Sequence, residues 1–321
     1  MRISKEKLLA EAELTGFRAE ILEKVIHLLN LLQAFNSHPF LKDRLALKGG
    51  TALNLFVFPL PRLSVDIDLN YIGTVDRESM LSERPKVEEA ISAVCQREGL
   101  AIRRIPGDHA GGKWLLRYQS ALALGANLEI DLNFMFRVPL WPVIKRDSQS
   151  IGSYKARNIP VLDIHELAAG KLAALLARHA SRDLFDAHQL LTNGNLDAKR
   201  LRLAFVVYGA MNRKDWREVS VKDIEAKSDE LERFLVPLLH KSFFDEIGTP
   251  SRWAKRIATD CRKGLGIVLP LSRPERQFLD VLLDKGDVNP QLLTQDSALA
   301  KRVEEHPALV WKALNVRRFK G

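Results

Sequence analysis

The sequence predicts an α+β protein, in which a mixed β-sheet with helices on one side precedes an all-helical region. Two observations predict this. Up to about residue 160, segments that alternate like β-strands follow a helix and a Gly-Gly turn, whereas from Asp163 onward apolar residues recur at helical spacing. We therefore expect a boundary near Ile159-Pro160, with residues 1–160 forming one domain and residues 161–321 a second, helical domain.

Each element of the first domain follows from a local pattern. Ile21, Val25 and Leu29 share one face of a helix expected over residues 17–36. Residues 83–98 form a second expected helix, closed by Gly99. Alternating or extended segments predict strands at residues 44–47, 63–71, 101–105, 113–119 and 127–134. In the helical region, breaks are expected near residues 193–195, 248–250 and 269–270.

Composition restricts the class of protein. Of 321 residues, 46% are hydrophobic and 28% are charged, which is typical of a folded globular chain. No apolar run reaches the roughly 20 residues of a membrane helix, and the charged N-terminus lacks a signal-peptide core, so we expect a cytoplasmic protein without a membrane partner. Cys95 and Cys261 lie far apart and are expected to be reduced, buried thiols. The net charge of +9 favours polyanionic partners such as nucleic acid.

The strand near residue 66 carries the sharpest chemical signal. Alternation places Ser64, Asp66, Asp68 and Asn70 on one face. Two carboxylates at positions i and i+2 of a strand repel each other unless a cation lies between them, and such a pair suits Mg²⁺. The alternative is an amphipathic strand whose solvated face happens to be acidic.

A second strand repeats this arrangement and carries Asp131 on the corresponding face. If the two strands are neighbours, Asp66, Asp68 and Asp131 would form a three-carboxylate cluster able to hold two metal ions. The turn Gly49-Gly50-Thr51 precedes the acidic strand, and its backbone N–H groups would approach a triphosphate closely. The chain contains no GxxxxGK[ST] motif, which excludes a P-loop NTPase.

A charged helix supplies a third group of candidates. If one helix runs from Lys171 to Asp186, Arg178 and Arg182 lie on the same stripe as these two residues, and Asp183 projects away from it. The alternative is a solvated charged face with an Arg182–Asp186 surface pair, which would contribute only about 0.5 kcal/mol to stability.

Four blocks in this order resemble the AbiEii-type nucleotidyltransferase toxins, within the DNA polymerase β-like superfamily. The resemblance covers about residues 45–190. The blocks are Lys48-Gly49-Gly50-Thr51-Ala52-Leu53, Arg62-Leu-Ser64-Val-Asp66-Ile-Asp68-Leu, Glu129-Ile-Asp131-Leu, and Lys171 through Arg182-Asp183-Leu-Phe-Asp186. The resemblance implies a polymerase β-like nucleotidyltransferase fold followed by a helical domain. It also implies transfer of NMP from an NTP to an RNA end, commonly the 3′ end of tRNA, which blocks translation.

The resemblance implies roles for individual residues as well. Asp66 and Asp68 would bind Mg²⁺ or Mn²⁺, Lys171 and Asp186 would be essential site residues, and the third carboxylate, here Asp131, varies more within the family. An antitoxin encoded alongside would be the protein partner. The residues expected to contact the nucleotide are Gly49, Gly50, Thr51, Ser64, Arg178 and Arg182.

Several alternatives remain open at the level of the sequence. The enzyme would instead modify a hydroxyl of a protein or small molecule, or the acidic strands would belong to a non-catalytic binding module. Ser64 would either lie at the nucleotide, where an added negative charge should switch the enzyme off, or be a purely structural serine.

Overall fold

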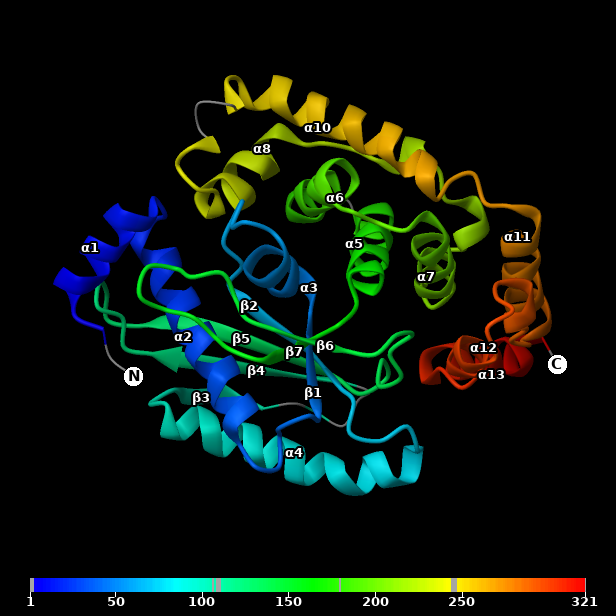
Figure 1. The fold of residues 1–321 in the computed structure, drawn as a ribbon, viewed down its shortest axis with the longest axis horizontal. Helices are drawn as coiled ribbons and strands as arrows, with labels where there is room; N and C mark the ends of the chain where they lie inside the picture. Colours follow the sequence, from blue (N-terminus) through cyan, green and yellow to red (C-terminus); the bar gives the residue numbers. More distant parts are fainter. Residues whose placement is uncertain (1–2, 106, 108–110, 179, 244–246, 321) are drawn as a thin grey trace. The chain divides into compact units, whose positions relative to one another are not determined.

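The computed structural model describes residues 3–105, 107, 111–178, 180–243 and 247–320 (Figure 1). The chain forms two compact units. The first contains Met1–Arg137, Val143–Leu162 and Val236–Glu246, and the second contains Val138–Pro142, Asp163–Leu235 and Ile247–Gly321. Two short segments, 138–142 and 236–246, thus belong to a different unit from the residues that flank them.

The first unit is built on a mixed sheet, as the sequence predicts. Its seven described strands follow the order β3-β4-β5-β2-β1-β7-β6. β2 is parallel to β5 and β1 is parallel to β7, whereas the other neighbouring pairs are antiparallel. The strands are β1 (Leu45–Lys48), β2 (Asp66–Tyr71), β3 (Ala101–Arg104), β4 (Gly111–Tyr118), β5 (Ala126–Asn133), β6 (Ile144–Arg146) and β7 (Ile159–Val161).

The helices of the first unit lie around this sheet. They are α1 (Lys5–Thr15), α2 (Ala19–Ser37), α3 (Gly49–Thr51), its π-helical continuation η1 (Ala52–Val57), α4 (Arg77–Arg97) and the single turn η5 (Val236–Leu238). The predicted helix over residues 17–36 is confirmed as α2. The predicted helix over residues 83–98 begins earlier than expected, at Arg77, because the Asp76 side chain caps it by accepting a hydrogen bond from the Ser79 N–H.

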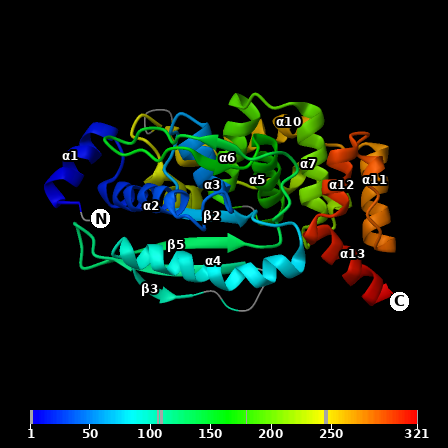
Figure 2. The same ribbon diagram turned by 60° about the horizontal axis from the view of Figure 1, so that its bottom comes forward.

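The apolar face of the sheet is covered by α2 and α4, which lie side by side in Figures 1 and 2. Ile67, Leu69 and Tyr71 of β2 are buried, as alternation predicts. Trp114 of β4 is also fully buried, and its indole N–H donates to Ser92 of α4. Burial on this face fixes the strand register, because a slip by one residue would turn these side chains to the opposite face.

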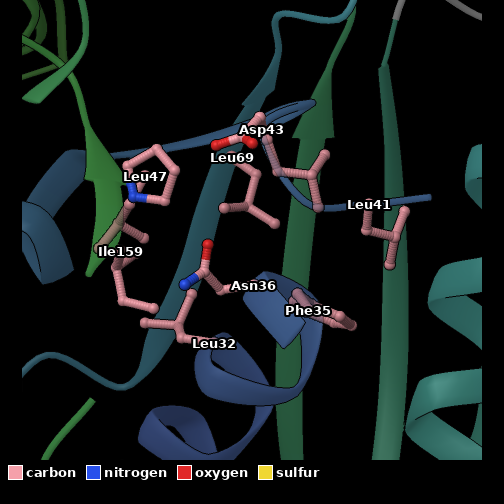
Figure 3. Close-up of a pocket in the computed structure, with 10 residues that line it drawn as sticks. Leu32, Phe35, Asn36, Leu41, Asp43, Leu47, Leu69 and Ile159 are labelled. Atoms are coloured by element: carbon pink, nitrogen blue, oxygen red, sulfur yellow. The ribbon is translucent and has the colours of Figure 1, made fainter. Parts of the chain in front are cut away.

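A small pocket lies on this apolar side, next to α2 (Figure 3). Its lining residues Leu47 and Leu69 alternate with Lys48 and Asp68, so the pocket and the carboxylates are on opposite faces of the sheet. Most of the lining is aliphatic or aromatic, including Leu32, Phe35, Leu41, Leu45 and Ile159. We therefore interpret the pocket as a packing defect of the core and place the chemistry on the other face.

The second unit is helical, as predicted. Its principal helices are α5 (Ile164–Arg178), α6 (Ser181–Asn193), α7 (Ala198–Ala210), α10 (Pro250–Gly264), α11 (Arg273–Asp280), α12 (Ser297–Glu304) and α13 (Pro307–Lys320). Shorter helical turns are η2 (Trp216–Glu218), η3 (Val221–Asp223), α8 (Ser228–Glu230), η4 (Leu231–Leu235), η6 (Leu265–Ile267), η7 (Val281–Lys285) and η8 (Pro290–Leu292). The breaks expected near residues 193–195, 248–250 and 269–270 all fall at helix ends or between helices.

Burial agrees with most expectations about individual side chains. Cys95 and Cys261 are buried free thiols. The tryptophans at 114, 216 and 253 are buried, whereas 58% of Trp311 is exposed. In the described part of the chain, no helix is both long and apolar enough to cross a bilayer.

Candidate active site

An acidic face is formed by the two central parallel strands of the first unit. The register pairs Asp66 with Glu129 and Asp68 with Asp131. Residues paired in this way point to the same side of a sheet, on strands about 4.8 Å apart. The two acidic strands are therefore neighbours, which is the condition for bringing Asp131 to Asp66 and Asp68, and Glu129 adds a fourth carboxylate to this face.

The carboxylates lie in a row of charges that crosses four strands. Lys48 of β1 pairs with Asp68, and Lys113 of β4 pairs with Asp131, so a lysine flanks the two aspartates on each side. The ammonium nitrogen of Lys113 is 3.9 Å from Asp131 Oδ2 and 3.6 Å from Glu129 Oε2. Burial raises the pKa of Asp131 and the charge of Asp68 adds to this rise, whereas the two lysines oppose it.

Gly49 brings backbone close to this row. Its φ is +73°, and a Cβ atom at this position would overlap the Asp68 carboxylate oxygen Oδ2. Only glycine combines this backbone conformation with so close an approach. The start of α3 therefore lies beside the acidic face, and a helix start is a favourable place for a phosphate group.

Three further predicted site residues take part in the local fold. The Thr51 side chain is fully buried, and its hydroxyl donates to the carbonyl oxygen of Asp66. The carbonyl oxygen of Gly50 accepts a hydrogen bond from the Asn54 side chain at 2.9 Å. Ser64 is buried and precedes β2, because the strand begins at Asp66 and not at residue 63 as expected. Thr51 thus holds the helix start against the acidic strand, whereas the Gly50 hydrogen bond lies within the helical segment.

The donor atoms on this face fit a divalent cation. Carboxylate oxygens are hard ligands, and Mg²⁺ usually takes one or two of them together with water and substrate phosphates. Asn70, one row beyond Asp68, is buried, and its Oδ1 atom has no hydrogen-bond partner among the described residues. Within the same described part, no three His, Cys, Asp or Glu side chains converge to hold a metal ion. The structure thus offers the Asp68–Asp131 pair, not a preformed three-carboxylate cage.

A second charged cluster belongs to the helical unit. The Lys171 ammonium nitrogen is 2.9 Å from Asp183 Oδ1 and 2.9 Å from Asp186 Oδ2. Arg178 also binds Asp183, with its Nε 2.6 Å from Oδ2 and its Nη2 3.1 Å from Oδ1. Both carboxylates are buried, whereas 65% of the Arg178 side chain is exposed.

This geometry corrects two expectations. The helix does not continue from Lys171 to Asp186, because α5 ends at Arg178 and α6 begins at Ser181, after an extended Ala180; residue 179 lies outside the described residues. Asp183 does not project away from the charged residues but binds two of them. The alternative of an Arg182–Asp186 surface pair is also wrong in one respect, since Asp186 is fully buried and binds Lys171, while Arg182 is exposed.

Four charged residues of these clusters are not among the candidate site residues that the sequence indicates: Lys48, Lys113, Glu129 and Asp183. Lys113 and Lys48 lie on the polar faces of their strands, and a correct strand order would have placed them beside the carboxylates. The role of Asp183 could be predicted only if the break between α5 and α6 were known. One signal of this break was present in the sequence. Asp183 follows Ser181 by two positions, and acidic residues favour the first turn of a helix.

The comparisons with known proteins agree with the fold. The family model "Nucleotidyl transferase AbiEii toxin, Type IV TA system" matches residues 30–263, well over half of the chain. The chain therefore belongs to this family of nucleotidyltransferase toxins from type IV toxin–antitoxin systems. The computed structure is similar to that of MenT4, a nucleotidyltransferase toxin from Mycobacterium tuberculosis H37Rv, with a TM-score of 0.57, 20% sequence identity, and coverage of 91% of this chain and 92% of that one. No match was found among the curated proteins.

Proposed function

We propose that this toxin transfers NMP from an NTP to an RNA hydroxyl at the 3′ end of tRNA and so blocks translation. The family generally uses a divalent metal and an NTP, and its members act within toxin–antitoxin pairs. The observation that carries the proposal is the register that sets Asp68 beside Asp131, next to the Gly49 backbone. This arrangement supports nucleotide binding with its phosphates at the start of α3 and its α-phosphate near the carboxylates.

The reaction forms one bond and breaks one. The acceptor hydroxyl oxygen bonds to the α-phosphorus, the bond between this phosphorus and the bridging oxygen breaks, and pyrophosphate leaves with that oxygen. The hydroxyl proton passes to water. The Asp68–Asp131 pair, joined by Asp66 when the nucleotide is bound, would hold a divalent cation, Mg²⁺ or Mn²⁺. This cation would supply the positive charge that activates the hydroxyl and neutralises the leaving pyrophosphate. Lys48 and Lys113 attract phosphate oxygens toward the same face.

The charged cluster of the helical unit has a part in this proposal. The sequence resemblance makes Lys171 and Asp186 essential, and the arginines at 178 and 182 are proposed to bind phosphate groups. The burial of Lys171 between two carboxylates supports a role for this lysine in organising the cluster. Asp183 joins the set because it contacts both Lys171 and Arg178.

RNA is the acceptor that the charge of the protein favours. A net charge of +9 attracts polyanions through phosphate contacts. A protein or small-molecule hydroxyl would gain nothing comparable from this charge. Three exposed or half-exposed cations of the first unit, Lys48, Lys113 and Arg117, lie on or next to the acidic face and would offset its repulsion of RNA.

The direct test incubates the protein with total RNA, with Mg²⁺ or Mn²⁺, and with each of the four NTPs labelled at the α-phosphate. We expect label from at least one NTP to appear in RNA of tRNA size and to disappear when the metal is chelated. Asp66→Ala and Asp68→Asn should each lower transfer by about a thousandfold or more while the thermal unfolding curve stays intact. Label on protein, on small molecules or on nothing would contradict the proposal and favour one of the alternatives.

A further inference from the structure

Four side chains of α5 and α6 form a line of alternating charge that runs from the interior to the surface. Asp186 binds Lys171, Lys171 binds Asp183, and Asp183 binds Arg178. The exposed fractions of these side chains are 0% for Asp186, 11% for Lys171, 1% for Asp183 and 65% for Arg178. The exposed end of the line is therefore a guanidinium group, and everything behind it is buried.

Asp183 is the link that holds the two cations together. Its Oδ1 atom accepts hydrogen bonds from both Lys171 Nζ, at 2.9 Å, and Arg178 Nη2, at 3.1 Å. Its Oδ2 atom accepts from Arg178 Nε at 2.6 Å. Arginine and carboxylate thus meet through two parallel hydrogen bonds, which fix the plane of the guanidinium as well as its position. Burial alone would raise the pKa of Asp183, but the two cations together lower it, so the carboxylate stays ionised at neutral pH.

The break between the helices makes this link. Because α6 starts at Ser181 after an extended residue, Asp183 lies in the first turn of α6 and faces back to the last turns of α5. A negatively charged side chain in the first turn is also stabilised by the helix N-terminus. Leu184 and Phe185 anchor the same turn in the core, so the position of Asp183 is fixed by packing on its own helix.

We propose that Asp183 is a positioning residue that holds Arg178 ready to bind a phosphate group of the NTP or of the RNA. In this arrangement Lys171, itself bound to Asp186, fixes the position of Asp183 from the buried side. Arginine suits the task because its charge is permanent and its planar guanidinium group matches the geometry of phosphate oxygens. The proposal rests on the nucleotidyl transfer proposed above and assigns to Asp183 a role that acts through another residue.

The first test changes the exposed end alone. Arg178→Ala should weaken binding of a non-hydrolysable NTP analogue or of tRNA by about tenfold, which corresponds to the loss of one charge-assisted phosphate contact. The unfolding temperature should fall, since the buried Asp183 loses one of its two cations, but the protein should stay folded because Lys171 still binds this carboxylate. Arg276→Ala, at an exposed arginine of α11, is the matched control and should bind both ligands normally. Unchanged affinity of Arg178→Ala for both ligands would overturn the proposal.

The second test asks whether Asp183 acts through Arg178. Asp183→Asn keeps the shape of the side chain and removes its charge, and it should weaken binding of whichever ligand Arg178→Ala affects. In the double variant the loss should not exceed that of the larger single loss by more than about twofold. A loss equal to the product of the two single losses would show that Asp183 is merely structural. Should Asp183→Asn not fold, Arg178→Lys replaces it, because lysine keeps the charge but cannot form the paired hydrogen bonds and should bind the ligand more weakly than wild type.

Measuring the NTP analogue and tRNA separately distinguishes the two possible sources of the phosphate group that Arg178 binds. A loss confined to the NTP analogue assigns Arg178 to the nucleotide, and a loss confined to tRNA assigns it to the acceptor. A wild-type protein that binds neither ligand would overturn the function proposed above together with this inference. A wild-type protein that binds and transfers normally, with the variants at 178 and 183 unaffected, would overturn this inference alone.

Discussion

Gly49 shows at the scale of one residue how the backbone limits what the site accepts. Its positive φ and the overlap that a Cβ atom would make with Asp68 Oδ2 leave no room for any other residue. Any residue substituted for Gly49 must therefore displace either the Gly49–Thr51 turn or the Asp68 carboxylate. Because Asp68 belongs to the proposed metal pair, a small displacement should affect catalysis far more than folding.

We therefore expect Gly49→Ala to lower the transfer rate by about a hundredfold or more while the free energy of unfolding falls by only about 1–2 kcal/mol. Rate measurements under saturating NTP, combined with denaturant unfolding, check both parts. Gly266→Ala is the matched control, because a Cβ there meets no atom within 4 Å and the backbone is not left-handed. Normal activity of Gly49→Ala would mean that Asp68 has no fixed role in the reaction.

Lys171 is a second single residue with a large expected effect, in this case on the stability of the fold. Replacing this lysine by alanine would leave Asp183 and Asp186 buried with one compensating charge fewer. We expect Lys171→Ala to lower the free energy of unfolding by about 3 kcal/mol or more, measured with urea, whereas Lys255→Ala at an exposed lysine of α10 should change it by less than about 0.5 kcal/mol. A stable Lys171→Ala protein would indicate that water or a rearrangement compensates both carboxylates.

At the scale of elements, Glu166 joins parts of the helical unit. It lies in the first turn of α5, is buried, and accepts hydrogen bonds from the hydroxyl of Tyr208 on α7 at 3.0 Å and from the backbone N–H of Trp141 at 3.2 Å. The segment 138–142 is thereby fastened to two helices. Burial raises the pKa of Glu166 to about 7, although these hydrogen bonds lower it. Folding therefore favours the protonated form of this side chain.

The raised pKa of Glu166 makes stability depend on pH. The unfolded-state pKa is near 4.5 and the folded-state pKa near 7, so the contribution to stability is fully present below about pH 4.5 and is lost as pH rises through 7. Glu166→Gln does not titrate. Between pH 5 and pH 8 the stability of wild type should therefore fall relative to this variant by on the order of 2–3 kcal/mol, measured as denaturant unfolding at several pH values. Parallel pH profiles for the two proteins would contradict the raised pKa.

Element by element, the sequence predicts some features and not others for physical reasons. The pair β2 and β5 is predictable because each alternates over at least six residues, and alternation is a strong signal. β6 and β7 contain three residues each, and β7 includes Pro160, so neither carries a pattern. The break after Arg178 is invisible because the residues on both sides suit a helix. The register that brings Lys113 to Asp131 depends on strand order, which local patterns do not encode.

At the scale of the whole molecule, the surplus of positive charge should control the encounter with RNA. Each phosphate contact releases counterions, so affinity falls as salt rises. With a net charge of +9, we expect tRNA binding to weaken by about tenfold or more between 50 and 200 mM salt, measured by filter binding or fluorescence anisotropy. A neutral polymer of similar size is the control ligand and should not bind. Affinity for tRNA that is independent of salt would contradict an electrostatic encounter.

The burial of both cysteines makes the molecule suitable for site-specific labelling. The chain has two cysteines, and burial raises the pKa of each thiol to about 12, so almost no reactive thiolate is present at neutral pH. A cysteine introduced at Leu124, where 95% of the side chain is exposed, should therefore react with a maleimide much faster than either native thiol. A second one at Phe319, 90% exposed, would place a dye on the other unit. Energy transfer between the two dyes would then report, in real time, any change in their separation as nucleotide and RNA bind.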